Sequence, residues 1–132
     1  MENLTDFFNS DKFAKLCGIE LLEVKPGYAR CSMRISENHE NAMGTVMGGA
    51  IFTLADYTFG VAANSRGTLA VSLNVTINYM KPGLGPMLYA VAEEVTKTRS
   101  TGVFQIVVTD EKGERISTAT GTCYFKKQLK VG

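Results

Sequence analysis

The alternation of apolar and polar side chains predicts six strands. Residues 69–80 read LAVSLNVTINYM, in which the two kinds of side chain alternate strictly, as they do in a strand with one face towards a core. Residues 19–25 and 28–35 predict two strands joined by a hairpin turn at Pro26-Gly27. Three further strands are predicted over residues 87–96, 103–109 and 115–126, with turns at 97–102 and 110–114.

Residues 47–64 predict one long helix that is apolar nearly all round. The segment opens with Gly48-Gly49, and its other residues include Ile51, Phe52, Leu54, Ala55, Phe59, Val61, Ala62 and Ala63. A helix without a polar face must be covered on most sides. At 1.5 Å per residue this helix would be about 27 Å long, so it needs a broad partner surface, and only a sheet wrapped around it supplies one.

The order of elements therefore predicts a single α+β domain over residues 1–132. One or two short helical turns are expected before Gly18, followed by a hairpin, the long helix and four consecutive strands. Short connections between consecutive strands favour an antiparallel meander, with the helix buried against it. We expect the apolar members of residues 69–80 to belong to the core.

Composition narrows the function classes without identifying one. Hydrophobic residues make up 45% of the chain, charged residues 20%, and the formal net charge is +1. We therefore expect no nucleic-acid partner and no membrane partner. The segment 41–65 is too polar for a transmembrane span, and the N-terminus does not have the pattern of a signal peptide.

The cysteines and the single histidine argue against a metal centre. Cys17, Cys31 and Cys123 are odd in number, far apart and without a CxxC pair, and His39 is the one histidine. This pattern favours free thiols in the reducing cytoplasm over a disulfide framework or a zinc site. We expect neither a metal nor another cofactor.

Asp56 is the residue that most needs an explanation. It is the one charged residue between Asn41 and Ser65, and it lies inside the apolar helix. A buried carboxylate without a partner is unfavourable by several kcal/mol, so it is rarely placed there without a purpose. The start of the helix at Gly48-Gly49 offers unpaired N–H groups that suit an oxyanion. These groups lie about 12 Å from Asp56 along the axis, so two antiparallel copies of the helix would have to share a site across a dimer.

The residues Asn41, Gly44, Gly48, Gly49, Leu54 and Asp56 form the string N-x-x-G-x-x-x-G-G-x-x-x-x-L-x-D. This string resembles the hotdog-fold acyl-CoA thioesterases, most of all the phenylacetic-acid-degradation protein group related to 4-hydroxybenzoyl-CoA thioesterase. The resemblance extends through AVSLNVTINYMKP at residues 70–82 and GTCYF at residues 121–125. It implies an antiparallel sheet wrapped around one long central helix, and homodimers with composite sites that pair into homotetramers.

The resemblance also implies a role for each matching residue. Asp56 would activate water or attack the thioester directly, and the Gly48 amide would polarise the carbonyl. Asn41 would position the water or the carbonyl, and Ser72 would support the carboxylate across the interface. Substrate or coenzyme A would meet Gly49 and Met47. Four surface cations could also meet coenzyme A: Arg66, Lys81, Lys97 and Arg99. Lys97 and Arg99 are the preferred candidates, because they flank a turn.

One position departs from the family pattern, since Met47 stands where the family often has histidine. Methionine cannot donate a proton, so the site would lose about 1–3 kcal/mol of transition-state stabilisation. Two readings follow: a hydrolase of acyl-CoA thioesters, or an acyl-CoA-binding or sensing protein without catalysis. A hotdog enoyl-CoA hydratase is a third reading, but no histidine follows Asp56 to pair with it.

Several of these residues also have plain structural readings. Asn41 could be a loop or capping residue, Ser72 a polar strand residue, and Gly48-Gly49 a point of close helix–sheet packing. His39 is expected to be a loop side chain. Phe52, Tyr57 and Phe59 could line an acyl pocket or belong to the core.

Overall fold

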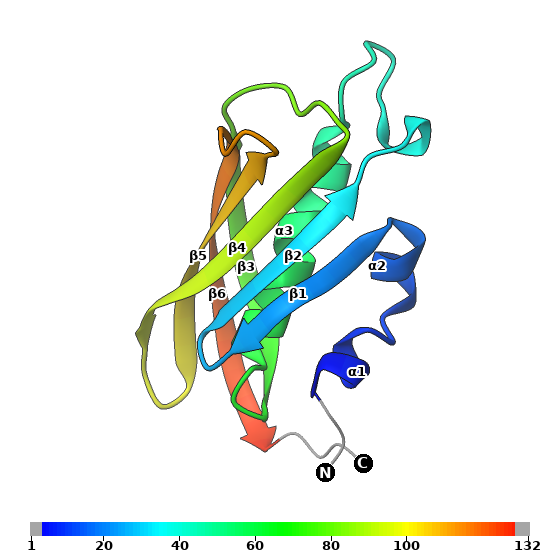
Figure 1. Cartoon of the computed structure of the whole chain (residues 1–132). Helices are drawn as coiled ribbons and strands as arrows, with labels where there is room; N and C mark the ends of the chain where they lie inside the picture. Colours follow the sequence, from blue (N-terminus) through cyan, green and yellow to red (C-terminus); the bar gives the residue numbers. More distant parts are fainter. Residues whose placement is uncertain (1–3, 129–132) are drawn as a thin grey trace.

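A computed structural model describes residues 4–128, and it shows a curved six-stranded antiparallel sheet folded around one long helix (Figure 1). The helices are α1 (Leu4–Phe8), α2 (Lys12–Leu16) and α3 (Gly48–Ala63), with a short 3-10 turn at Glu37–His39. The strands are β1 (Ile19–Lys25), β2 (Tyr28–Arg34), β3 (Thr68–Tyr79), β4 (Met87–Lys97), β5 (Thr101–Asp110) and β6 (Arg115–Gln128). The predicted hotdog architecture is confirmed.

The sheet closes around α3 because small side chains line its concave face. Ala29 of β2 and Ala90 and Ala92 of β4 are fully buried there, so these strands approach the helix closely. On β6, a β-carbon at Gly121 would lie 2.8 Å from the ring of Phe59 on α3, so only glycine fits beneath that ring. The Phe59 ring also contacts Phe104 of β5, with 5.6 Å between centroids.

The strand order is β1-β2-β4-β5-β6-β3, which corrects the expected meander. Strands β4, β5 and β6 do follow one another as predicted, but β3 pairs with β6 and not with β4. Residues 80–86 carry the chain across the end of the sheet from β3 to β4 (Figure 1). A connection of this length, containing two prolines and two glycines, is not confined to a hairpin, which is why adjacency in sequence did not give adjacency in the sheet.

Strand β3 is the open edge of the sheet, and its apolar face is less buried than expected. Leu73 is an extra residue between Ser72 and Asn74, which pair with Cys123 and Thr122, and it is 60% exposed. This bulge reverses the alternation, so Ser72 shares a sheet face with the buried Cys123. The expectation that the whole apolar set belongs to the core is therefore wrong at this edge.

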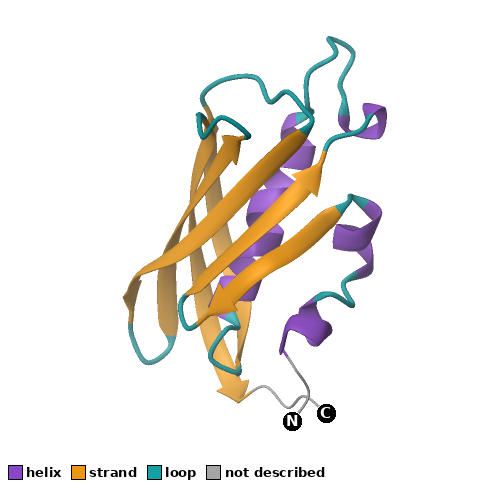
Figure 2. Ribbon diagram, in the orientation of Figure 1, coloured by secondary structure: helices purple, strands orange, loops and turns teal. Residues whose placement is uncertain are grey.

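The opposite edge strand, β1, lies beside the N-terminal helices. Figure 2 shows α1 and α2 flanking β1 on the side of the sheet where α3 lies.

In the part of the chain described, no helix has the length and apolar character that a membrane span requires.

Candidate active site

Helix α3 begins with two amide groups that are free to bind an anion. Met47 is the N-cap residue, and its carbonyl accepts hydrogen bonds from the N–H groups of Ala50 (2.9 Å) and Ile51 (3.2 Å). Within residues 4–128, the N–H groups of Gly48 and Gly49 donate to no acceptor. The helix dipole adds partial positive charge at the same point, so an oxyanion would be stabilised there.

The two glycines at the helix start have different surroundings. A β-carbon at Gly48 would lie 3.3 Å from the ring of Tyr79 on β3, whose hydroxyl donates to the Gly48 carbonyl at 3.1 Å. No atom lies within 4 Å of the corresponding point at Gly49. Gly48 therefore permits close packing, while Gly49 leaves open space for a ligand. Sequence reasoning missed Tyr79, because its position in the alternation marked it only as a strand residue.

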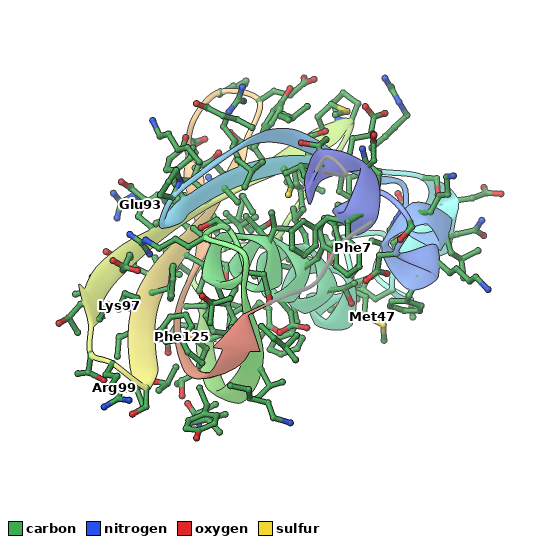
Figure 3. All side chains as sticks on the ribbon, turned by 90° about the horizontal axis from the view of Figure 1, so that it is seen from below. Phe7, Met47, Glu93, Lys97, Arg99 and Phe125 are labelled. Atoms are coloured by element: carbon green, nitrogen blue, oxygen red, sulfur yellow. The ribbon has the colours of Figure 1, made fainter. Side chains whose placement is uncertain are left out.

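A hollow of about 380 Å³ opens beside this helix start. Gly48, Tyr79 and Lys81 contribute to its lining, together with the segment around Gly83. The side chain of Met47 is exposed and caps no backbone group (Figure 3). Methionine cannot transfer a proton, as the histidine expected from the family pattern would.

His39 supports the loop before the helix. Its Nε2 hydrogen donates to the Cys17 carbonyl at 2.6 Å, and its Nδ1 accepts from the Ser36 N–H at 2.9 Å. Its own carbonyl accepts from the Met47 N–H at 2.8 Å. Both ring nitrogens are thus occupied, which agrees with the expected role as a loop side chain.

Asn41 is largely engaged within its own loop. Its side-chain oxygen accepts from the N–H groups of Met43 (2.9 Å) and Thr45 (3.2 Å), and its Nδ2 donates to the Thr45 hydroxyl at 3.0 Å. One Nδ2 hydrogen remains available for a water or a carbonyl. Asn41 therefore makes the contacts expected of a loop residue. Any role in orienting a reactant depends on this one Nδ2 hydrogen.

Asp56 is half-buried on α3 and has no hydrogen-bond or ion-pair partner among residues 4–128. Burial raises the pKa of its carboxyl group, and the negative charge of Asp11 raises it further. A raised pKa makes the carboxylate a stronger base than an ordinary aspartate. Asp11 was missed from the sequence, because it caps the short helix α2 and no spacing relates it to Asp56.

The remaining predicted site residues lie apart from the helix start. Ser72 is exposed on β3, and its hydroxyl has no partner in the described region. Lys97 and Arg99 lie at the β4–β5 turn, at the end of the sheet where α3 finishes (Figure 1). Figure 3 shows them on the far side of the molecule from Met47. The Lys97 ammonium lies 4.9 Å from the centre of the Phe125 ring.

The other surface cations considered are occupied. Arg66 contacts Glu94 at 2.6 Å, and Lys81 contacts Glu114 at 2.9 Å. Over residues 4–128, no three histidine, cysteine, aspartate or glutamate side chains gather in a way that could hold a metal ion. The chemistry on offer is therefore a carboxylate base or nucleophile, and an oxyanion site about 12 Å away along the helix axis.

Comparison with known proteins decides the family. Residues 43–117 match the Thioesterase superfamily. A putative esterase of Archaeoglobus fulgidus is 37% identical over 126 residues, which cover 94% of this chain and 82% of that protein. The chain belongs to the thioesterase superfamily. The expected relationship to the hotdog thioesterases is confirmed, and this chain is a thioesterase.

Two further relatives place this thioesterase within the superfamily. Acyl-coenzyme A thioesterase PaaI of Escherichia coli is 30% identical, with 91% of this chain and 86% of that protein covered. The E. coli PaaI structure superposes with a TM-score of 0.92, at 27% identity and over 97% and 94% of the two chains. A Streptococcus pneumoniae hypothetical thioesterase, solved with coenzyme A, superposes with a TM-score of 0.87, at 27% identity and over 96% and 99%.

Proposed function

We propose that this chain hydrolyses acyl-CoA thioesters to a free acid and coenzyme A. The observation that carries the proposal is the half-buried, unpartnered carboxylate of Asp56 on the helix whose first two N–H groups are free. The relatives described as acyl-coenzyme A thioesterase and as solved with coenzyme A support this choice of substrate.

In the proposed reaction, Asp56 accepts a proton from water as the water oxygen attacks the thioester carbonyl carbon. The negative charge that develops on the carbonyl oxygen is stabilised by the N–H of Gly48, and Gly49 leaves room for the thioester. The carbon–sulfur bond then breaks, and the thiolate of coenzyme A takes up a proton. Asn41 orients the water through its remaining Nδ2 hydrogen. In the second route Asp56 attacks the carbonyl carbon directly, the carbon–sulfur bond breaks to release the coenzyme A thiolate, and water hydrolyses the resulting anhydride.

A second copy of the chain is needed to complete this site, because the carboxylate and the oxyanion donors lie too far apart in one chain. The uncovered face of α3 carries Gly49, Thr53, Asp56 and Gly60, and no atom lies within 4 Å of the β-carbon positions at the two glycines. A neighbouring antiparallel helix therefore has room to approach. The open edge of β3 offers unpaired backbone groups beside it.

This homodimer would also bring other predicted residues to the site. When antiparallel helices place Gly48 of one protomer opposite Asp56 of the other, the end of α3 in one protomer extends about 10 Å past the start of α3 in its partner. Lys97 and Arg99, which lie at that end, would then reach the coenzyme A phosphates bound near Gly48. Ser72 lies on the sheet face that carries the helix, where it could support the carboxylate across the interface.

Two further parts of the proposal concern assembly and location. On the outer face of the sheet, Val91 and Val107 pair with each other and are partly exposed, and Arg30 of β2 lies beside Val91. A second interface there would pair the dimers into a homotetramer. Cys17, Cys31 and Cys123 are free thiols, which suits the cytoplasm.

The test is release of free thiol from aromatic, short-chain and long-chain acyl-CoAs by the wild type and by Asp56→Asn. We expect turnover of at least one acyl-CoA by the wild type and a loss of about 10³-fold or more in the variant. In a single turnover in heavy-oxygen water, label in Asp56 would identify direct attack, because it enters only when water opens an anhydride at the aspartyl carbonyl. An Asp56→Asn protein with wild-type turnover would overturn the proposed mechanism.

The second candidate function is binding or sensing of acyl-CoA without hydrolysis, and Met47 is the observation that favours it. Its exposed thioether lies at the helix start where a proton donor would act. This candidate predicts calorimetric binding of acyl-CoA by the wild type with no thiol released over hours.

A further inference from the structure

A cavity of about 470 Å³ lies between the N-terminal helices, β1 and α3. Its apolar wall is formed by Ala14 of α2 and by Ile19 and Leu21 of β1, and the rings of Phe8 and Tyr57 line it as well. Charged and polar residues line the rest of it: Asn9, Asp11, Lys15 and Glu20. This volume lies within the range of pockets that bury a small organic ligand.

Helix α3 contributes one residue to the lining of the cavity. Tyr57 lines it and directly follows Asp56 on α3. Asp11 also lines it; burial raises the pKa of both Asp56 and Tyr57, and the charge of Asp11 raises each further. Helix α2, which Asp11 caps, also packs against α3. A thioester held at Asp56 would therefore have the cavity beside its acyl group.

The segment that covers the cavity is held by few contacts. The Tyr57 hydroxyl donates to the Phe8 carbonyl at 2.9 Å, which joins α3 to α1. Helices α1 and α2 have five residues each and are too short to be stable alone. Phe13 and Leu16 are 59% and 81% exposed, so they contribute little to holding α2 in place.

We propose that this cavity receives the acyl group of the substrate, and that the Tyr57–Phe8 hydrogen bond limits its depth. The inference rests on the proposed acyl-CoA function and names the substrate class. An apolar wall and a volume of about 470 Å³ suit an uncharged acyl group the size of octanoyl or phenylacetyl. Asp11 and Glu20 outweigh Lys15 among the charged lining residues, and this net negative charge disfavours an acyl group that ends in a carboxylate, such as succinyl.

Two neighbouring residues on β1 provide a matched test. Leu21 lines the cavity, whereas Leu22, next to it, does not line it and is 42% exposed. We expect Leu21→Trp to lower kcat/KM for octanoyl-CoA by about tenfold or more, while kcat/KM for acetyl-CoA changes by no more than about twofold. Leu22→Trp should leave both values unchanged. Equal losses on both substrates in Leu21→Trp, or no loss on either, would overturn the inference.

The hydrogen bond is tested separately with Tyr57→Phe, which keeps the ring. Loss of the bond should let the cover move outwards and raise dodecanoyl-CoA turnover relative to octanoyl-CoA by about threefold or more. An unchanged ratio would show that the bond does not limit the depth of the cavity. Circular dichroism checks that each variant is folded.

A binding measurement separates failure of this inference from failure of the proposed hydrolysis. In an Asp56→Asn background, calorimetry compares octanoyl-CoA with coenzyme A alone. The octanoyl group should strengthen binding, and Leu21→Trp should abolish that gain while Leu22→Trp preserves it. This result would support the cavity assignment even if the wild type released no thiol. An equal Kd for the two ligands would overturn it.

Discussion

At the scale of the residue, the isolation of Asp56 is the feature that calls for a functional explanation. Its carboxylate is half-buried and lacks an ion-pair partner in the described region, so the fold gains nothing from its charge. Proteins keep such a group where a reaction needs a base with a raised pKa. The sequence already indicated this residue, because it is the one charged residue between Asn41 and Ser65.

Asp56→Asn should stabilise the fold at neutral and alkaline pH. Burial, with help from Asp11, raises the pKa of Asp56 above the value of 3.8 for a free side chain. The stability linked to this proton is present below the unfolded pKa and is lost as pH rises through the folded pKa. Because the side chain is half exposed, we expect a gain in unfolding free energy of at most about 1 kcal/mol at pH 8.

Thermal unfolding of the wild type and Asp56→Asn at two pH values checks this. The difference in Tm should be clear at about pH 8 and vanish at about pH 3, where the wild-type carboxyl group is protonated. Glu111→Gln, in the exposed β5–β6 turn, is the control and should show no such trend. A wild type more stable than the variant at pH 8 would mean that Asp56 has a stabilising partner.

The oxyanion donor can be removed by Gly48→Pro without breaking the helix. Proline lacks an N–H and is favoured at the first helical position, and Met47 already has the extended conformation (φ −62°, ψ 140°) that a residue before proline prefers. We expect kcat to fall by about 10²–10³-fold. Gly48→Ala adds the same β-carbon against Tyr79 but keeps the N–H, so it should lose much less activity. Equal losses in the two variants would point to crowding at Tyr79.

At the scale of the element, helix and strand boundaries could be predicted closely, whereas positions within the sheet could not. Residues 47–64 were expected to form the helix that is observed as Gly48–Ala63 between its two cap residues. Apolar periodicity determines such an element locally. The bulge at Leu73 and the pairing of β3 with β6 depend on contacts between segments far apart in the chain, which periodicity does not encode.

Gly121→Ala tests how closely β6 approaches α3. Its new methyl group would lie 2.8 Å from the buried Phe59 ring, so the ring or the strand must shift. We expect a loss of about 1–3 kcal/mol in unfolding free energy, measured by urea denaturation. Thr120→Ala, at the neighbouring exposed position, should change it by less than about 0.5 kcal/mol. A neutral Gly121→Ala would contradict the described packing.

At the scale of the whole molecule, the candidate site is split between the start and the middle of one helix. Sequence spacing alone predicted the separation of Gly48 and Asp56, and hence the need for a second protomer. It could not reveal that Asn41 is mostly engaged with Thr45, or that Tyr57, the neighbour of Asp56, lines a cavity under α1 and α2. Both depend on how the loops and the N-terminal segment fold back on the core.

The open β3 edge should carry the dimer interface. In the double variant Val71→Lys and Leu73→Lys, like charges would meet across the two-fold axis, so we expect a monomer by sedimentation and loss of activity with the fold retained. Leu22→Lys places one charge on the other edge strand and should leave assembly unchanged. A double variant that stays dimeric would place the interface elsewhere.

The most direct test of the central claim mixes two inactive variants, Asp56→Asn and Gly48→Pro, and allows their subunits to exchange. In a hybrid dimer, one site combines an intact Gly48 from one protomer with an intact Asp56 from the other. An equal mixture should therefore recover about one quarter of wild-type thiol release, since half of the dimers are hybrids with one intact site each. Activity that stays at the level of the separate variants, although mass spectrometry shows hybrids, would contradict a site shared between protomers.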